Sequence, residues 1–411
     1  MHSNTSSVLV EVSLRQDSNV EDSSVRSAVS SFLSRHCYII RPGPLCFTSD
    51  KFLSEHCDSI TISDPSHTIN PFHKVLFFWQ VTFDIAVFHL HTTGGESEHL
   101  EEEDDNAETP ALTQWPLPST HFAGSWEALL YEEDIKSKLL QYTTTALRFS
   151  DANVNPNFIT WNRVVLLHGP PGSGKTSLCK ALAQKLSIVL HSRFSTSHLV
   201  EINAHSLFSR WFSESGKLVL RMFDTIADLL TDPNTFITVL IDEVESLSAS
   251  RKAAMSGSEP SDAIRVVNAL LTQIDRVGKL PNVLIMCTTN ITAAVDLAFV
   301  DRADLKLFLG LPPPRIVYTL FSQSIDSLMN SGLIKKCKLA SWDDRQENEV
   351  GKALEDVANV AHGFSGRALR KLPFIAFAFY SRTSSMNLLE FLDSLKRAII
   401  IEKNNRELLD D

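Results

Sequence analysis

Residues 169–176 combine glycines, a lysine and a threonine in an order suited to phosphate binding. The segment reads GPPGSGKT, follows an apolar run at 163–169 and opens a helical pattern. Glycines let backbone N–H groups wrap around phosphates, and a helix N-terminus adds positive potential. We predict an ATP site in which Lys175 reaches the outer phosphates and the Thr176 hydroxyl binds Mg²⁺. The residues expected to bind the nucleotide here are Gly169, Pro170, Pro171, Gly172, Ser173, Gly174, Lys175, Thr176 and Ser177.

Two adjacent acids end the apolar run at 236–243, FITVLIDE. At the carboxyl end of a buried strand, Asp242 is expected to bind Mg²⁺, largely through water, and Glu243 to polarise the water that attacks the γ-phosphate. Such a pair can also cap a helix. The phosphate loop upstream favours the catalytic interpretation.

The next apolar run, at 282–290, ends on Asn290. Its amide could contact both the γ-phosphate and the attacking water, although an asparagine at a strand end is often a turn residue. The order of Lys175, the acid pair and Asn290 on successive strands favours the catalytic role. Phosphoryl transfer needs mainly positioning and charge neutralisation, which these groups supply.

Two arginines complete the predicted catalytic set. Arg302, in AFVDRADLK, lies where it could reach a neighbouring subunit's nucleotide, and the alternative is a surface ion pair with Asp301 or Asp304. Arg367, in GFSGRALRKLP, opens a helix that could close over the γ-phosphate, with Arg370 as the fallback.

The elements around these residues indicate an α/β fold. Near-continuous apolar runs alternate with helical patterns, which predicts a parallel sheet with helices on both faces. These runs lie at 163–169, 199–203, 236–243, 282–290 and 305–311. Earlier in the chain, alternating segments and one helix at 25–36 predict a small α+β domain. The expected domains are an N-terminal α+β recognition domain at 1–93, an acidic, solvated linker at 94–110, a large ATPase subdomain at 111–312 and a small helical lid at 313–411.

The amino-acid composition limits the classes of partner and the cellular compartment that we expect. Of 411 residues, 43% are hydrophobic and 21% charged, as in globular proteins. The net charge of −11 includes eight carboxylates at 96–108, and the balance elsewhere is only −3. The sequence contains no dense run of Lys and Arg, so we do not expect it to bind nucleic acid directly. No apolar stretch is long enough to span a membrane, and the six scattered cysteines indicate a reducing compartment, so we expect the cytoplasm or nucleus.

Several motifs resemble those of AAA+ ATPases, namely HGPPGSGKT, LIDEVESL, RVVNALLTQID and GFSGRALRKLP. More narrowly, EINAHSLFSRWFSESGKLV, SEPSDAIRVVNALLTQID and AFVDRADLK resemble the pachytene checkpoint protein 2 family. The match is close from about 115 to 380 and weaker over the first 93 residues. Many AAA+ relatives have two arginines in the segment that corresponds to AFVDRADLK. This chain has only one there, and the narrower family also has one.

The resemblance implies a homohexameric ring that remodels HORMA-domain proteins with a HORMA-like adaptor. Such proteins act in spindle-checkpoint silencing, by converting a closed HORMA protein to its open form, and in meiosis, by removing HORMA proteins from chromosome axes. The resemblance therefore implies that this protein acts in the nucleus and cytoplasm, including at chromosome axes and kinetochores.

The AAA+ resemblance also assigns two pore loops. Trp211 and Phe212 would form the first and grip an unfolded segment, with Gly216 as its hinge, and 248–264 would form the second. The alternative places Phe208, Trp211 and Phe212, which have helical spacing, in the core.

Two other functions are open. An ATP-binding assembly switch would need only Lys175 and Asp242, and has no use for Glu243, Asn290 and Arg302. An AAA+ unfoldase of another substrate class would share the whole set, but no peptidase motif supports coupling to a protease.

Overall fold

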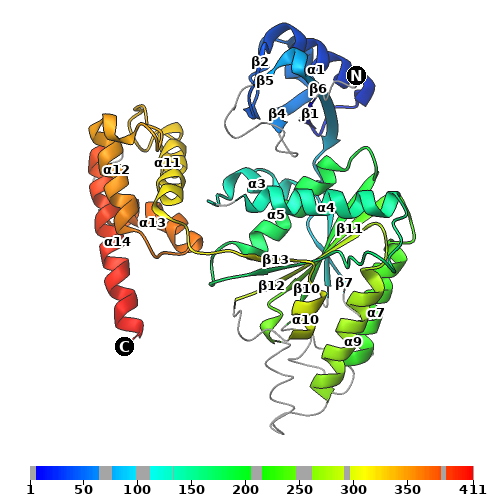
Figure 1. Cartoon of the computed structure of the whole chain (residues 1–411). Coiled ribbons are helices and arrows are strands. Elements are labelled where there is room, and N and C mark those ends of the chain that lie inside the picture. The colour runs from blue at the N-terminus through cyan, green and yellow to red at the C-terminus, as the bar shows by residue number, and fades with distance from the viewer. Residues whose placement is uncertain are drawn as a thin grey trace. The chain divides into compact units, whose positions relative to one another are not determined.

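The structure is a computed structural model that describes residues 6–63, 76–98, 112–132, 134–204, 215–246, 262–290, 297–380 and 386–410. Figure 1 shows the chain coloured from its N-terminus to its C-terminus. It divides into two compact units. The first comprises Met1–Trp126, Ile135–Leu167 and Thr176–Leu307, and the second comprises Glu127–Asp134, His168–Lys175 and Phe308–Asp411.

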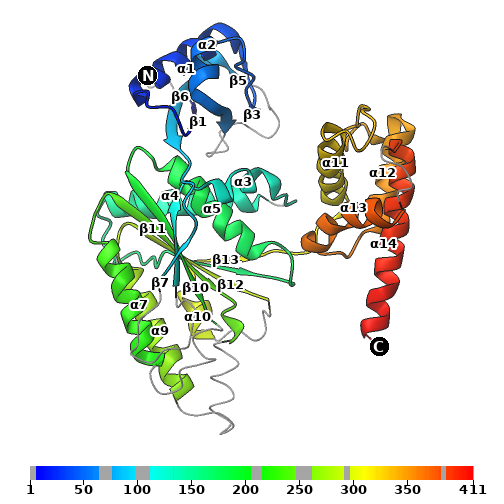
Figure 2. The same ribbon diagram turned by 180° about the vertical axis from the view of Figure 1, so that it is seen from behind.

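The N-terminal part of the first unit is a four-stranded mixed sheet with two helices, seen from behind in Figure 2. The strand order is β3-β4-β1-β6, with β1 parallel to β6 and antiparallel to β4. The elements are β1 (Ser6–Leu14), α1 (Asp22–His36), β2 (Ile39–Ile40), β3 (Gly43–Pro44), α2 (Lys51–His56), β4 (Cys57–Ser63), β5 (Leu76–Phe77), η1 (Phe78–Gln80) and β6 (Val81–His89). Alternate β1 residues Val8, Val10 and Val12 are buried with Val29 and Leu33 of α1, as the period-2 and helical patterns predict.

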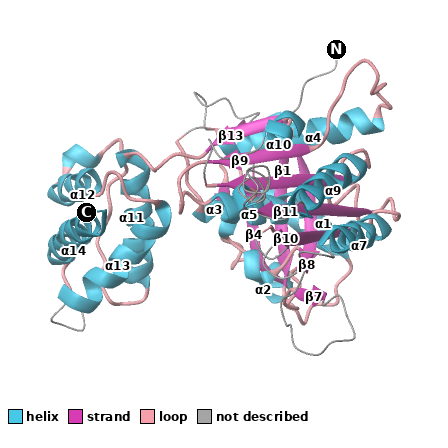
Figure 3. Cartoon of the chain, turned by 90° about the horizontal axis from the view of Figure 1, so that it is seen from below, coloured by secondary structure: helices cyan, strands magenta, loops and turns pink. Residues whose placement is uncertain are grey.

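A seven-stranded sheet forms the centre of the first unit, in the order β13-β9-β12-β11-β10-β8-β7. Figure 3 shows most of these strands side by side. The strands are β7 (Glu96–Glu98), β8 (Leu112–Leu117), β9 (Val164–His168), β10 (Thr196–Asn203), β11 (Thr235–Asp242), β12 (Val283–Thr289) and β13 (Leu305–Phe308). The pairs β10–β11 and β11–β12 are parallel, and β12 is buried throughout.

Helices cover both faces of this sheet, with α4 and α5 on one face and α7, α9 and α10 on the other (Figures 1 and 2). Their bounds are α4 (Ile135–Asp151), α5 (Lys175–Val189), α7 (Ser215–Leu229), α9 (Asp262–Val277) and α10 (Leu297–Arg302). Met222 and Phe223 of α7 and Val267 and Leu270 of α9 join one core cluster with the sheet. The predicted fold class is confirmed, with five strands close to the predicted runs.

One detail differs from the sequence analysis. Glu96–Glu98, in the expected solvated linker, form edge strand β7 and pair antiparallel with β8. Antiparallel strands pair through main-chain hydrogen bonds, which need no apolar run in the sequence, and charged residues suit a sheet edge. Between β8 and the sheet-covering α4 lie η2 (Thr120–Phe122) and α3 (Ser125–Ala128). Asp134, of a type favoured at N-caps, comes directly before α4.

The helical part of the second unit consists of α11 (Pro314–Asn330), η4 (Arg345–Glu347), α12 (Glu349–Val360), α13 (Gly366–Tyr380) and α14 (Leu388–Asp410). Pro314 opens α11, where its missing N–H costs nothing. Val317, Phe321 and Ile325 lie on one buried stripe of that helix. Asn348 caps α12 by accepting a hydrogen bond from the Gly351 N–H (2.6 Å). Every helix in the described ranges falls short of the length and hydropathy needed to cross a bilayer.

Candidate active site

The phosphate-binding loop follows β9 and leads into α5, as predicted. Gly169, Gly172 and Gly174 have φ values of 147°, 76° and 95°, which favour glycine. A Cβ on Gly169 would lie 2.1 Å from the carbonyl oxygen of Leu309, so this position has no room for a side chain. The glycines therefore give the loop both its curvature and its close approach to backbone, as a phosphate cradle requires.

Lys175 lies in the first turn of α5 and is buried. Its Nζ donates to the carbonyl oxygens of Gly169 (2.9 Å) and Pro170 (3.0 Å). Preceding the loop, His168 has a lowered pKa, because burial and then the positive charge of Lys175 disfavour its protonation. Lys175 is therefore the cation that the loop offers to phosphates at neutral pH.

Thr176 and Asp242 meet as the magnesium prediction requires. Thr176 Oγ1 donates to Asp242 Oδ1 (3.0 Å) and Oδ2 (3.1 Å). Asp242 also accepts a hydrogen bond from the Thr288 hydroxyl, on neighbouring β12. A hydroxyl beside a carboxylate is an all-oxygen donor set of the kind Mg²⁺ binds, usually with several waters retained. The residues present thus fit the ion.

Glu243 follows β11 in a left-handed backbone conformation, with φ of 59°. A non-glycine residue there is strained, and such strain concentrates at functional sites. The turn is fixed to β12, because Glu243 N–H donates to Thr288 Oγ1 (3.2 Å) and Val244 N–H donates to the Thr288 carbonyl (3.0 Å). The side chain of Glu243 is exposed, so it is free to approach a water molecule.

Asn290 follows the last residue of β12, and its partner is a residue that the sequence analysis missed. Its N–H (3.1 Å) and Nδ2 (2.9 Å) both donate to Glu245 Oε1. Only its position, three residues after Asp242, could have pointed to Glu245 in the sequence.

Arg302 ends α10 and forms an ion pair, but with a different partner from those considered. Its Nε and Nη2 each lie 2.8 Å from an oxygen of Asp275, on α9, and Nη1 donates to the Ala298 carbonyl (2.8 Å). Asp304, one of the expected partners, instead accepts from Tyr142 Oη (2.6 Å) and the Asn162 N–H (2.7 Å). Two-point pairing holds the guanidinium in one orientation at a partly exposed position.

Arg367 lies in the first turn of α13, and its backbone N–H donates to the Gly172 carbonyl (3.2 Å). The structure therefore brings the start of this helix against the phosphate-binding loop. The Arg367 side chain is exposed. The fallback, Arg370, is occupied at the Ala128 carbonyl.

The predicted pore-loop aromatics Trp211 and Phe212 lie outside the described residues, as does most of 248–264. Gly216 lies in the first turn of α7. A helical conformation makes no special demand for glycine, so the geometry gives its hinge role no support.

Comparison with known proteins follows the same division of the chain. The family of ATPases associated with various cellular activities (AAA) matches residues 165–311. The TRIP13-like AAA+ ATPase lid C-terminal domain matches 314–403, and the TRIP13 N-terminal domain matches 3–93.

The pachytene checkpoint protein 2 homolog of Danio rerio is 45% identical over 401 residues, covering 95% of this chain and 93% of the relative. This chain belongs to the pachytene checkpoint protein 2 family. It is accordingly an AAA ATPase, which binds and hydrolyses ATP.

Other relatives agree with the assignment. The human pachytene checkpoint protein 2 homolog is 43% identical over 411 residues, covering 98% of this chain and 94% of the relative. The structure of C. elegans PCH-2 matches with a TM-score of 0.79 and 34% identity, over 97% of this chain and all of that one. A chain of the E. coli MS115-1 HORMA:CdnC:Trip13 complex shares the fold, with a TM-score of 0.53 and 18% identity over 69% of this chain and 94% of that one.

Proposed function

We propose that this ATPase forms a homohexameric ring that partly unfolds HORMA-domain proteins, converting their closed form to the open form with the help of a HORMA-like adaptor. The observation that carries the proposal is that family similarity extends beyond the ATPase core to the N-terminal domain at 3–93. That domain lies outside the hydrolytic motifs, so its similarity supports a shared substrate and adaptor. We place this activity in the nucleus and cytoplasm, including chromosome axes and kinetochores.

ATP hydrolysis would use the predicted residues in the following roles. Lys175 and the loop N–H groups hold the phosphates, and Thr176 and Asp242 hold Mg²⁺. Magnesium, when bound, neutralises charge on the phosphate oxygens. Glu243 accepts a proton from the attacking water, and Asn290 orients that water.

Arg302 would act on the nucleotide of a neighbouring subunit. It lies on α10 with its guanidinium fixed by Asp275, so its orientation is set before any partner arrives. This arrangement makes hydrolysis depend on assembly. Arg367 would respond to the γ-phosphate from the lid helix α13.

Purified protein tests the proposal directly. ATP turnover is measured alone, with a HORMA protein, and with that protein plus its adaptor, while the closed and open forms are separated by ion-exchange chromatography. Stimulated turnover with conversion to the open form is expected. Unstimulated turnover with no conversion would leave an ATPase of another substrate class.

A further inference from the structure

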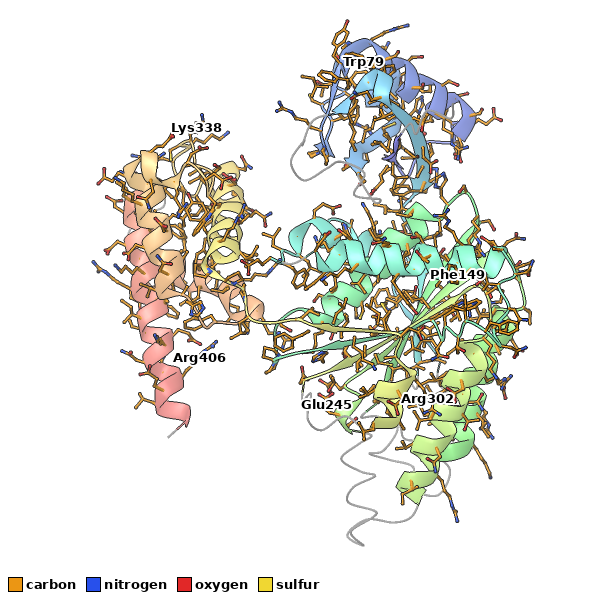
Figure 4. The ribbon with its side chains drawn as sticks, in the orientation of Figure 1. Trp79, Phe149, Glu245, Arg302, Lys338 and Arg406 are labelled. Atoms are coloured by element: carbon orange, nitrogen blue, oxygen red, sulfur yellow. The ribbon has the colours of Figure 1, made fainter. Side chains whose placement is uncertain are left out.

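A second acid of the β11 turn, Glu245, is bound to Asn290. Strands β11 and β12 are parallel neighbours, so their carboxyl ends lie at the same edge of the sheet. Asn290 N–H (3.1 Å) and Nδ2 (2.9 Å) converge on the single oxygen Oε1 of Glu245. Glu245 is labelled in Figure 4. Its other oxygen, Oε2, is buried and has no hydrogen-bond partner among the described residues, so within the described residues this carboxylate accepts hydrogen bonds from Asn290 alone.

We propose that Glu245 is a positioning residue for ATP hydrolysis, which fixes the orientation of the Asn290 amide. An ionised carboxylate only accepts hydrogen bonds, so the amide edge that faces it must be the NH₂ group. Oδ1 of Asn290 then points away from Glu245 and can accept a hydrogen from water. One hydrogen of Nδ2 is held by Glu245, which leaves the second for a phosphate oxygen.

The turn that carries Glu245 is itself rigidly held. Val244 is fully buried and its N–H is bonded to the Thr288 carbonyl (3.0 Å). Ser246 donates through its N–H (3.1 Å) and Oγ (2.8 Å) to the Glu243 carbonyl. The Val244 bond ties the turn to β12, whereas the Ser246 bonds stay within the turn. Glu245 is therefore held relative to β12 through Val244, and it can hold Asn290 in one geometry without rearrangement during the reaction.

This inference rests on the proposed role of Asn290 in hydrolysis. A purely structural role is the alternative, in which Glu245 only satisfies a backbone N–H at a strand end. The two roles differ in what happens when Asn290 loses its side chain, because a positioning residue then has nothing left to position.

A double-mutant cycle on ATP turnover tests the inference, using full-length protein. Glu245→Ala should lower kcat about tenfold with little change in the affinity for ATP, since misplaced groups slow chemistry more than binding. Glu245→Gln keeps an acceptor oxygen and should recover most of that loss. Ser246→Ala, which removes another side-chain bond of the same turn, is the matched control and should keep more than half of the wild-type rate.

The decisive comparison is Glu245→Ala in the Asn290→Ala background, where less than a twofold further loss is expected. Losses that multiply across the two sites, or an equal loss in Ser246→Ala, would overturn the positioning role. If Asn290→Ala alone turns over at the wild-type rate, then the proposed function of Asn290 fails, and the Glu245 inference fails with it. Melting temperatures of all variants are compared so that unfolding is recognised as the cause of any loss.

Discussion

At the scale of single residues, the structure separates the two acids that follow Asp242. Glu243 is exposed on a left-handed turn, whereas Glu245 is bonded to Asn290. We therefore expect Glu243, and not Glu245, to act as the base. Glu243→Gln should therefore bind ATP normally while turnover falls about 100-fold or more, the usual size of general-base catalysis. Nucleotide binding by fluorescence and phosphate release measure the two effects. Undiminished turnover would remove Glu243 from its role.

Replacing Lys175 should have a different effect from replacing Glu243, because Lys175 is the buried cation of the phosphate loop. Lys175→Ala should lose ATP binding itself, not only hydrolysis. Equilibrium binding of a fluorescent ATP analogue measures this, and tight binding by the variant would contradict the loop's assignment.

The ionisation of two cysteine thiols predicts which of them an alkylating reagent labels first. Burial raises the pKa of the Cys287 thiol to about 12, so this residue holds its proton across the physiological range. Hydrogen bonds from Thr48 lower the pKa of exposed Cys46, which raises its thiolate fraction at any given pH. Since the thiolate reacts, iodoacetamide at pH 8 should label Cys46 first and leave Cys287 unlabelled, as peptide mass spectrometry can measure. Early labelling of Cys287 in folded protein would contradict its burial.

At the scale of elements, α5 connects the phosphate loop to the N-terminal domain. Lys185, ten residues beyond Lys175, forms a buried ion pair with Glu11 of β1 and donates to Ser63 Oγ (2.9 Å). Nearby, Leu9 of β1 packs on Ile188. The helix that begins at the nucleotide loop therefore ends against the domain proposed to bind substrate.

Breaking this pair should be costly. Lys185→Met leaves the Glu11 carboxylate buried without its cation and should reduce the free energy of unfolding by about 3 kcal/mol. The double variant Glu11→Leu with Lys185→Met removes both charges and should recover much of the loss. Calorimetric unfolding of the three proteins measures this. Equal losses in the single and double variants would show that packing, rather than the unpaired charge, dominates.

Continuous apolar runs were sufficient to predict the main strands, because β9, β11 and β12 are buried on both faces. They could not predict β7, because this strand is Glu96–Glu98 and its sequence contains no apolar residue. The phosphate loop and the acid pair were identifiable because their chemistry fixes a short local spacing. Asp275, Glu245 and Glu11 were missed, since each acts through a partner distant in sequence and no local pattern records such pairs.

At the scale of the whole molecule, the proposed function requires that ring assembly and substrate remodelling be linked to ATP hydrolysis. Arg302 is expected to complete a neighbour's site, so Arg302→Ala and Lys175→Ala subunits should each be inactive alone. Mixing them should restore part of the ATP turnover, because some sites then combine an intact Lys175 with a neighbour's intact Arg302. No recovery in rings shown by native mass spectrometry to be mixed would argue that Arg302 acts within its own chain.

Trp211 is proposed to transmit force to the substrate. Trp211→Ala should keep ATP binding and basal turnover but lose remodelling, because its indole would grip the substrate rather than the nucleotide. Unfolding of the variant would instead assign Trp211 to the core, and circular dichroism distinguishes the two outcomes.

The central claim is that ATP hydrolysis at this site opens a HORMA-domain protein. The most direct measurement follows the closed and open forms of a HORMA substrate, with adaptor and ATP, in parallel reactions with the wild-type chain and Glu243→Gln. Conversion by the wild-type protein and none by the variant is the predicted result. Equal conversion by both, or a substrate left closed while the wild-type protein hydrolyses ATP, would contradict it.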